Sequence, residues 1–328
     1  MKVEIQLDAA PTEAAQRAAE LAATGVHGLF TFEGPHDVFL PLALAAGAGV
    51  DVDLMTNVAI AIPRSPMHLA HTSWDLQALS RGRFRLGLGS QIKPHIENRY
   101  GATWSQPAAR MREIVLATKA ILTSWQDGTR LDFRGEFTRH TLMPPTFVPG
   151  PNPYGVPPVY LGALGPLMTQ VAAEVADGLL VMPFHSHRHF RERTLPALGT
   201  TRPGFAIQPQ AIVAMGASAD EQAAADLGVR GLLAFYGSTP AYRPVLDIEG
   251  WGDLQPQLNA LSKTGDVMAM IDLITPQMLE TLAVRGTPSE CAAEIERRFG
   301  DVAERVCVYF PGYRPRGELI AELVGALG

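Results

Sequence analysis

One pattern constrains the fold of this chain more than any other: short apolar runs alternate with helical segments along nearly its whole length. The clearest unit spans residues 78–91, which read ALSRGRFRLGLGSQ. A helix ends there, Gly82 supplies a left-handed stop, and a buried strand follows. The strand ends in Gly89, Ser90 and Gln91, small or polar residues where a backbone can approach a ligand. Such a unit belongs to an α/β barrel or a doubly wound sheet, and both folds place their sites at the carboxyl ends of the strands.

Eight such strands are predicted, and a helix follows nearly all of them. The count favours a (β/α)8 barrel, the TIM-barrel fold. Two insertions interrupt it: residues 127–158 after strand 4, rich in Pro and Gly with a short hairpin, and the helical residues 219–283 after strand 7. Because the alternation resumes after each, we expect a single domain over residues 1–328. The predicted strands are residues 3–7, 26–32, 51–62, 84–89, 159–161, 179–181, 205–215 and 306–309, and the main helices are 11–25, 38–48, 66–80, 93–101, 107–125, 166–176, 188–198, 288–299 and 316–327.

Composition excludes several classes of protein. The net charge is −6 and no basic run exceeds two residues, so we expect no nucleic-acid partner. Two cysteines cannot form a disulfide framework, and the amino terminus leads straight into a strand pattern, which favours the cytoplasm. The longest apolar run, residues 39–50, is too short to cross a bilayer and contains Pro41, so we expect no membrane association.

Two glycine-containing stretches follow predicted strands. Residues 87–89 fail as a dinucleotide fingerprint, because its third glycine would fall at Ile92. Their glycines either allow the strand to pack closely or border a ligand at its end. The second stretch leads from strand 5 into a helix, where free N–H groups favour a phosphate, although an ordinary turn explains the spacing equally well. It comprises Gly162, Ala163, Leu164, Gly165 and Pro166.

Two groups of titratable residues stand out. Residues 185–189 carry three alternating histidines, which would share one face of a strand but would splay apart at a helix start. We favour a solvated loop there and predict no metal site. The end of strand 2 carries Glu33, His36 and Asp37, where barrel enzymes place acids and bases. The alternative is that Asp37 caps the next helix and His36 is a loop residue.

The chain resembles the luciferase-like flavin and deazaflavin oxidoreductases nearly from end to end. The most specific stretch is DLQALSRGRF at residues 75–84. Other matching stretches keep the family's order and spacing: residues 64–70, 86–89, 133–136, 157–166 and 176–178. Three further stretches are similar to one branch, the probable coenzyme F420-dependent oxidoreductases of actinobacteria: GSQIKPHI at residues 89–96, FYGSTPAY at 235–242 and GWGDL at 250–254.

This resemblance implies a barrel of the bacterial luciferase-like type that binds F420 or FMN at the carboxyl ends of its strands. It implies a cofactor phosphate on the loop from Gly162 to Pro166, and a ring system against Asn57, Val58, Gly89, Ser90 and Gln91. It also implies a non-prolyl cis peptide at about Asn57–Val58. One departure is visible in the sequence: many relatives have an acid directly before a histidine after strand 2, whereas Glu33 is followed by Gly34 and the histidine is His36.

The function expected from these observations is F420-dependent hydride transfer between the deazaflavin and a small organic substrate. The protein then has to hold and shield the ring and to supply a proton acid or base. His36 is the first candidate for that role, with Glu33 and His95 as the others. Basic residues near the expected site, such as Arg64, Lys93 and Arg99, suit the anionic tail of F420.

Other functions stay open at this point. An FMN-dependent monooxygenase that uses reduced flavin and O2 is the main alternative, because the same fold hosts both chemistries. A non-catalytic cofactor carrier and a metal-dependent hydrolase built on residues 185–189 are weaker ones. In each enzymatic case we expect a small-molecule substrate and a homodimer.

Overall fold

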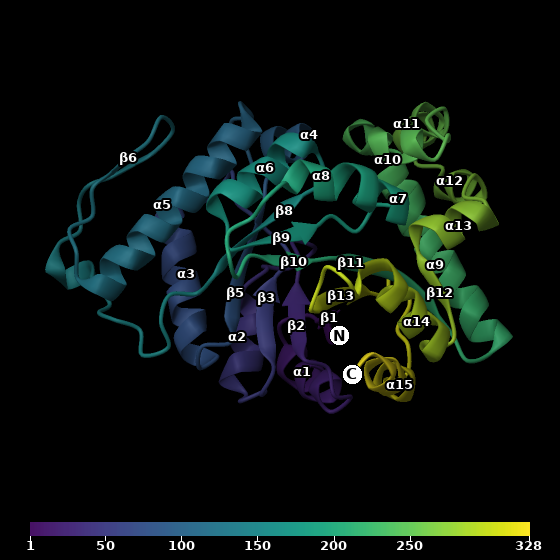
Figure 1. The fold of residues 1–328 in the computed structure, drawn as a ribbon, viewed down its shortest axis with the longest axis horizontal. Helices are drawn as coiled ribbons and strands as arrows, with labels where there is room; N and C mark the ends of the chain where they lie inside the picture. The colour runs from purple at the N-terminus through teal and green to yellow at the C-terminus, as the bar shows by residue number, and fades with distance from the viewer.

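The computed structural model describes residues 1–328, and its parallel strands form the centre of the molecule (Figure 1). Neighbouring strands pair in the order β10, β9, β8, β5, β3, β2, β1, β13, β11 and β12. All eight predicted strands are present, and all but the third begin and end within two residues of their expected bounds. The eight strands are β1 (Lys2–Gln6), β2 (Gly28–Thr31), β3 (Asp53–Thr56), β5 (Phe84–Gly89), β8 (Val159–Ala163), β9 (Gly178–Val181), β10 (Ala206–Gln208) continued as β11 (Gln210–Met215), and β13 (Arg305–Tyr309).

The sheet closes at Pro209, the residue between β10 and β11. On one side of it Ala206 pairs with Gly178 of β9, and on the other Gln210 pairs with Cys307 of β13. Proline has no N–H to give to a ladder, so a single strand is divided between two neighbours. Its carbonyl still accepts the Cys307 N–H at 2.9 Å. The predicted (β/α)8 barrel is therefore confirmed.

Strand 3 differs from its prediction as one run over residues 51–62. β3 ends at Thr56, and a short second piece, β4 (Ala59–Ile60), continues the pairing with β5 farther along that strand. The interruption is the peptide bond Asn57–Val58, which is cis. The cis bond implied by the family resemblance is therefore confirmed.

The helices follow the predicted pattern, with one exception. Residues 188–198 form three pieces instead of one helix: α7 (His187–His189), a π-helical turn (Phe190–Thr194) and α8 (Leu195–Leu198). Pro196 has no N–H for the carbonyl of Glu192, which explains the irregular turn. The regular helices are α1 (Ala14–Ala22), α2 (Leu40–Gly47), α3 (Pro66–Leu79), α4 (Lys93–Asn98), α5 (Pro107–Asp127), α6 (Pro166–Val175), α14 (Pro288–Phe299) and α15 (Gly317–Leu327).

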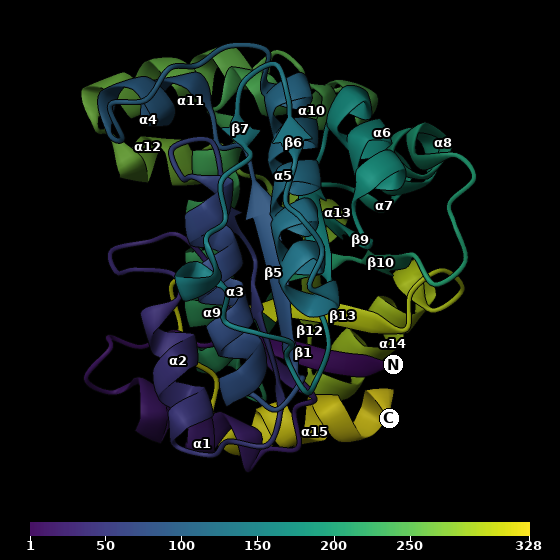
Figure 2. The same cartoon turned by 90° about the vertical axis from the view of Figure 1, so that its left-hand side faces the viewer.

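The first insertion contains the predicted short hairpin, formed by β6 (Phe133–Arg134) and β7 (Arg139–His140). It lies alongside α5 (Figure 2). Glu113 of α5 holds the turn, because its carboxylate accepts the backbone N–H groups of residues 136–138 at 2.5–2.8 Å. A Cβ on Gly135 would lie 2.1 Å from the Glu113 Cδ atom, so glycine is required at that close approach.

The second insertion, from α9 to β12, lies at the carboxyl ends of the strands, and we call it the roof of the barrel. The inner face of β11 continues above the barrel as Ile212 and Ala214, which pack against α9 (Ala219–Gly237). The roof continues through α10 (Arg243–Ile248), α11 (Leu254–Thr264), α12 (Val267–Asp272), α13 (Pro276–Leu282) and β12 (Val284–Gly286). Sequence patterns missed β12, a three-residue strand that pairs with β11. Both views place α10, α11 and α4 at the end of the molecule opposite α1 and α15 (Figures 1 and 2).

The barrel interior contains a polar network that the sequence did not predict. Glu4 of β1 is completely buried and pairs with Arg85 of β5 and, at 2.8 Å, with Arg305 of β13. Gln208 donates to Glu4 at 2.7 Å and accepts from Arg85 at 3.2 Å. Burial opposes ionisation of Glu4, but the two guanidinium groups hold its pKa below the ordinary value. These buried charges are thus paired across four strands.

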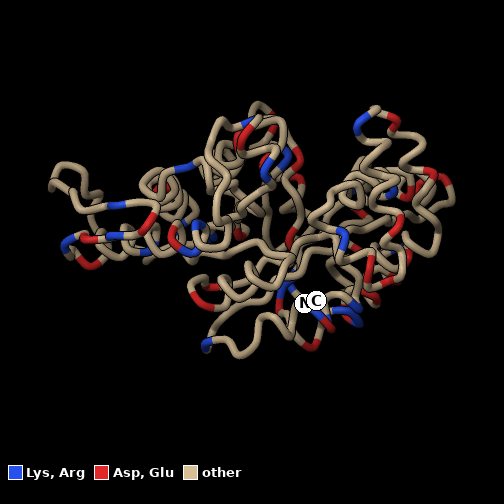
Figure 3. Tube along the Cα trace, turned by 90° about the horizontal axis from the view of Figure 1, so that it is seen from above, with Lys and Arg blue, Asp and Glu red and all other residues tan.

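Charged residues of both signs are interspersed along the chain around the edge of the molecule when it is seen from above (Figure 3). None of the helices combines the length and the apolar character needed to cross a membrane.

Candidate active site

Asn57 lies at the end of β3 with an amide that has no partner. The residue is only 6% exposed, and neither Oδ1 nor Nδ2 makes a hydrogen bond of ordinary geometry; its one polar neighbour is the buried Cys307 thiol, a weak partner. A buried amide without a partner costs free energy, and such groups in native proteins call for an explanation. A ligand that offers both a donor and an acceptor would satisfy it. The resemblance pointed to this residue, whereas its burial and unpaired state became visible only in the structure.

Val58 projects between two glycines of neighbouring strands. A Cβ on Gly89 of β5 would lie 2.4 Å from Val58 Cγ2, and one on Gly162 of β8 would lie 3.1 Å from Val58 Cγ1. Gly89 of β5 and Gly162 of β8 therefore make room for the Val58 side chain. At Gly87 the close-packing interpretation holds, because a Cβ there would lie 1.9 Å from the backbone oxygen of Thr56.

Ser90 and Gln91 lead the chain from β5 into α4. Both side chains are half-buried, and Gln91 has a left-handed φ of 60°. The Gln91 side chain turns back onto its own backbone, where Oε1 accepts the Ile92 N–H at 3.0 Å. The loop is thus fixed by local contacts.

The loop after β8 presents free backbone donors at the start of α6. Gly165 is the N-cap residue, and the first hydrogen bond of the helix runs from Thr169 N–H to Gly165 O at 3.1 Å. A Cβ on Gly165 would meet nothing within 4 Å, so the space in front of the loop is open. Four N–H groups donate no backbone hydrogen bond, which suits an anion at a helix N-terminus: those of Leu164, Gly165, Leu167 and Met168. Pro166 has no N–H, and Ala163 is buried.

Glu33 is engaged in a two-point ion pair at the end of β2. Its carboxylate receives both terminal nitrogens of Arg64, at 2.7 and 2.9 Å, and the Ile60 N–H at 3.0 Å. The side chain of Glu33 is 9% exposed and that of Arg64 is 21% exposed. Both oxygens are therefore already occupied by donors from the chain.

The other two acid/base candidates occupy different surroundings. His36 is exposed, whereas His95 is half-buried on α4. α4 is held to the strand-2 loop, because Arg99 donates to the Gly34 carbonyl at 3.1 Å. Asp37 accepts the Phe39 and Leu40 N–H groups at 2.8 and 3.0 Å, so its capping of α2, the structural alternative, is confirmed.

The prediction of a solvated loop at residues 185–189 is wrong for two of the three histidines, which are buried. Ser186 caps α7 and accepts the His189 N–H at 3.0 Å, and this turn directs His185 and His189 inward. Burial lowers the pKa of both imidazoles to about 4. No group of three or more His, Cys, Asp or Glu side chains is arranged to hold a metal ion.

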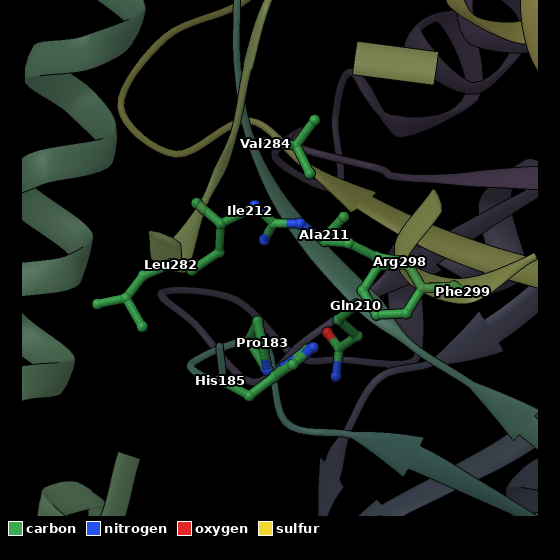
Figure 4. A pocket seen from close by; sticks show the side chains of 9 residues that line it. All are labelled: Pro183, His185, Gln210, Ala211, Ile212, Leu282, Val284, Arg298 and Phe299. Atoms are coloured by element: carbon green, nitrogen blue, oxygen red, sulfur yellow. The ribbon is translucent and has the colours of Figure 1, made fainter. Parts of the chain in front are cut away.

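His185 borders a narrow crevice together with Gln210 and Arg298 (Figure 4). Each of these polar side chains has a partner on the backbone. His185 Nδ1 donates to Met182 O at 2.7 Å, Gln210 donates to Val181 O at 3.0 Å, and Arg298 donates to the carbonyls that end α13. The crevice is thus a packing feature between β9, β11 and α14.

Comparison with known proteins places this site in a family. The model of the luciferase-like monooxygenases matches residues 2–304, so the chain belongs to that family. It is 47% identical over 304 residues to the uncharacterized protein Rv1360 of Mycobacterium tuberculosis, with 90% of this chain and 89% of that one covered. It is 28% identical over 311 residues to the putative coenzyme F420-dependent oxidoreductase Rv3520c of the same organism, covering 87% and 88%.

Solved structures share the fold at low sequence identity. The coenzyme F420-dependent tetrahydromethanopterin reductase from Methanopyrus kandleri superposes with a TM-score of 0.79 at 21% identity, covering 99% of this chain and 96% of that one. An F420-dependent secondary alcohol dehydrogenase gives 0.77 at 16% identity, covering 100% and 99%. The EDTA monooxygenase from Chelativorans sp. BNC1 gives 0.67 at 16% identity, covering 100% and 93%. The fold neighbours thus include F420-dependent reductases and monooxygenases.

Proposed function

We propose that this protein is an F420-dependent oxidoreductase that transfers a hydride between the deazaflavin and a small organic substrate. The observation that carries the proposal is the buried, unpartnered amide of Asn57, beside the Val58 side chain and its two glycines. A planar heterocycle with hydrogen-bonding edges would supply the partners this amide lacks. The open N–H groups that precede and begin α6 add a place for the cofactor phosphate.

Two considerations favour F420 over FMN. Relatives at 28% identity bear the names of F420-dependent oxidoreductase and 5,10-methylenetetrahydromethanopterin reductase. In addition, α4 offers Lys93, whose side chain is 62% exposed, and the adjoining Arg99, also exposed, to a long anionic tail.

The proposed division of labour follows from the site. F420 supplies two-electron hydride chemistry when it is bound. The backbone around Gly165 would bind the phosphate, Asn57 would orient the ring edge, and Val58 would support its face. A proton must also move to or from the substrate oxygen. Because both Glu33 oxygens are occupied by Arg64 and Ile60, we assign this proton to a histidine, either His95 on α4 or His36 on the strand-2 loop.

Direct titration tests the cofactor. Purified protein is titrated with F420 and with FMN, with fluorescence as the readout, and F420 should bind at least tenfold more tightly. If only FMN binds, the proposed F420 dependence is wrong and the alternative function, an FMN-dependent monooxygenase, takes its place. The EDTA monooxygenase among the fold neighbours is the reason for testing this alternative.

Single-turnover hydride transfer tests the proton acid/base. Loss of such a group should lower the rate by roughly 10²–10⁴ with cofactor binding intact. His95→Ala and His36→Ala are compared, with Glu33→Gln as the third variant. If both histidine variants react like the wild type, the assignment to a histidine is wrong.

A further inference from the structure

Five aromatic side chains gather where α9 crosses the strand ends, and the proposed cofactor role uses none of them. Tyr309 ends β13 on its inner face, and Phe32 follows β2 with its ring centroid 5.6 Å from that of Tyr309. Phe184, Tyr236 and Tyr242 form a triangle with centroid separations of 5.8, 6.2 and 5.9 Å. Leu232 of α9 packs against both the buried cluster that contains Phe184 and the one that contains Tyr309, so α9 joins the two groups.

The cluster borders the proposed cofactor position, because β2 pairs with β3 on one side of it and β9 pairs with β8 on the other, and Val58 and Phe32 both pack against the inner cluster that contains Tyr309. The cofactor residues come from β3, β5 and β8, whereas the rings come from the ends of β2, β9 and β13 and from the roof. Phe184 is fully buried, whereas Phe32, Tyr236 and Tyr242 are half-buried and keep exposed edges. The three half-buried rings therefore stay accessible to a ligand.

The tyrosine hydroxyls of this cluster lack the partners that a structural tyrosine has. Tyr313 shows the ordinary case: its hydroxyl accepts from Met215 N–H at 2.8 Å and donates to Val213 O at 2.9 Å. For Tyr236, Tyr242 and Tyr309, burial raises the pKa and no hydrogen bond offsets it. The rings of Tyr236 and Tyr242 lie 5.9 Å apart, and the nearby Tyr236 hydroxyl contributes to the raised pKa of Tyr309.

We propose that Tyr236, Tyr242 and Tyr309 form the substrate side of the site and select a planar aromatic compound that carries a carbonyl or hydroxyl group. This inference rests on the proposed function and deepens it. Aromatic rings favour offset or edge-to-face contacts at the separations found here. Hydroxyls without a protein partner favour a ligand oxygen, because a site built to hydrogen-bond such a group rejects compounds that lack it.

Ligand-observed NMR titration of the protein without cofactor tests the proposal with acetophenone, and with cyclohexanone as a ketone without an aromatic ring. Acetophenone should bind, and cyclohexanone at least tenfold more weakly. Tyr236→Phe and Tyr242→Phe should each weaken acetophenone about fivefold, the value of one net hydrogen bond. Tyr154→Phe, an exposed tyrosine of the first insertion, is the matched control and should bind like the wild type.

The outcomes separate this inference from the proposed function. Tyr236→Phe should leave F420 affinity unchanged, because Tyr236 comes from α9 and not from β3, β5 or the loop before α6, and the substitution keeps its ring. If the acetophenone pattern appears but F420 does not bind, the proposed function fails while the tyrosine site stands. If acetophenone does not bind, binds all variants equally, or binds no better than cyclohexanone, the tyrosine site is wrong whatever the cofactor titration gives.

Discussion

Arg64 and Glu33 fix the shape of the barrel mouth through a two-point ion pair, Nη2 to Oε1 at 2.7 Å and Nη1 to Oε2 at 2.9 Å. Both side chains also bind the backbone of Ile60, Glu33 at its N–H and Arg64 at its carbonyl, at 3.0 and 2.7 Å. Strand 2 is thereby tied to the residues that follow the cis peptide. The ion pair therefore holds in place the backbone around the Asn57–Val58 peptide bond, and we refer to it as the brace of this segment.

Removing one partner of this brace should therefore cost stability. Glu33→Ala leaves the largely buried Arg64 guanidinium unpaired, and the free energy of unfolding should fall by about 3 kcal/mol. Chemical denaturation measures it. Glu20→Ala, which breaks the exposed Arg17–Glu20 pair of α1, is the control and should change stability little. Equal effects of the two substitutions would contradict a bracing role for Glu33.

Asn57 should reveal a trade between stability and binding. Asn57→Leu replaces a buried, unpartnered amide with an apolar group of similar size, so the ligand-free protein should gain about 1 kcal/mol. F420 affinity should fall at least tenfold, because the amide is proposed to contact the ring. Thermal unfolding with and without F420 measures both effects. A variant that loses stability and keeps its affinity would remove Asn57 from the site.

Gly165 allows a clean test of the phosphate loop. Its φ and ψ of −78° and 155° suit any residue and a Cβ there meets nothing, so Gly165→Val should cost only about 1 kcal/mol of stability, the difference between glycine and valine at an N-cap. The branched side chain should nevertheless obstruct the approach of a phosphate and weaken F420 binding. Gly162→Val is a less selective variant, since its Cβ also presses on Val58. Unchanged F420 titrations for Gly165→Val would argue against this loop as the phosphate site.

Acid should destabilise the fold through two buried histidines. The pKa of His185 and of His189 is about 4 in the folded protein and 6.5 for an unperturbed imidazole. The unfolded chain therefore binds more protons between about pH 6.5 and 4, and stability is lost as the pH falls through that window, by about 3 kcal/mol for each group.

His185→Asn isolates one of these contributions. The Asn Nδ2 group can replace Nδ1 as donor to the Met182 carbonyl, so the fold is kept while the titrating group is removed. Denaturant midpoints measured from pH 7 to pH 4 should fall less steeply for this variant. His36→Asn, at an exposed position, should retain the wild-type slope. Identical slopes for all three proteins would show that His185 does not titrate as described.

The sequence by itself determined the order of elements and the kind of fold. The alternation of apolar runs and helices placed all eight barrel strands, and Gly82 was correctly predicted to end α3, with a left-handed φ of 86°. These features depend on local backbone geometry and on which face of an element is apolar, and both are recorded in adjacent residues. The resemblance to a known family added the cis bond at Asn57–Val58.

Only the tertiary structure decided which side chains meet. Glu33 was predicted as a candidate acid/base, but barrel closure brings Arg64 and Ile60 to its oxygens. The sequence predicted a solvated loop at the histidines of residues 185–189. In the structure Ser186 caps α7, and this turn directs two of the three histidines into the core.

The aromatic cluster and the polar network within the barrel depend on even longer separations. Leu232 packs against the cluster that contains Tyr309 because α9 folds back over the strand ends, and Arg85 reaches Glu4 across the closed sheet. No local period in the sequence encodes such pairs, since each partner's environment is created by the other strands when the sheet closes. The fold could therefore be predicted from the sequence, whereas the side-chain contacts at the carboxyl ends of the strands were determined only when the barrel closed.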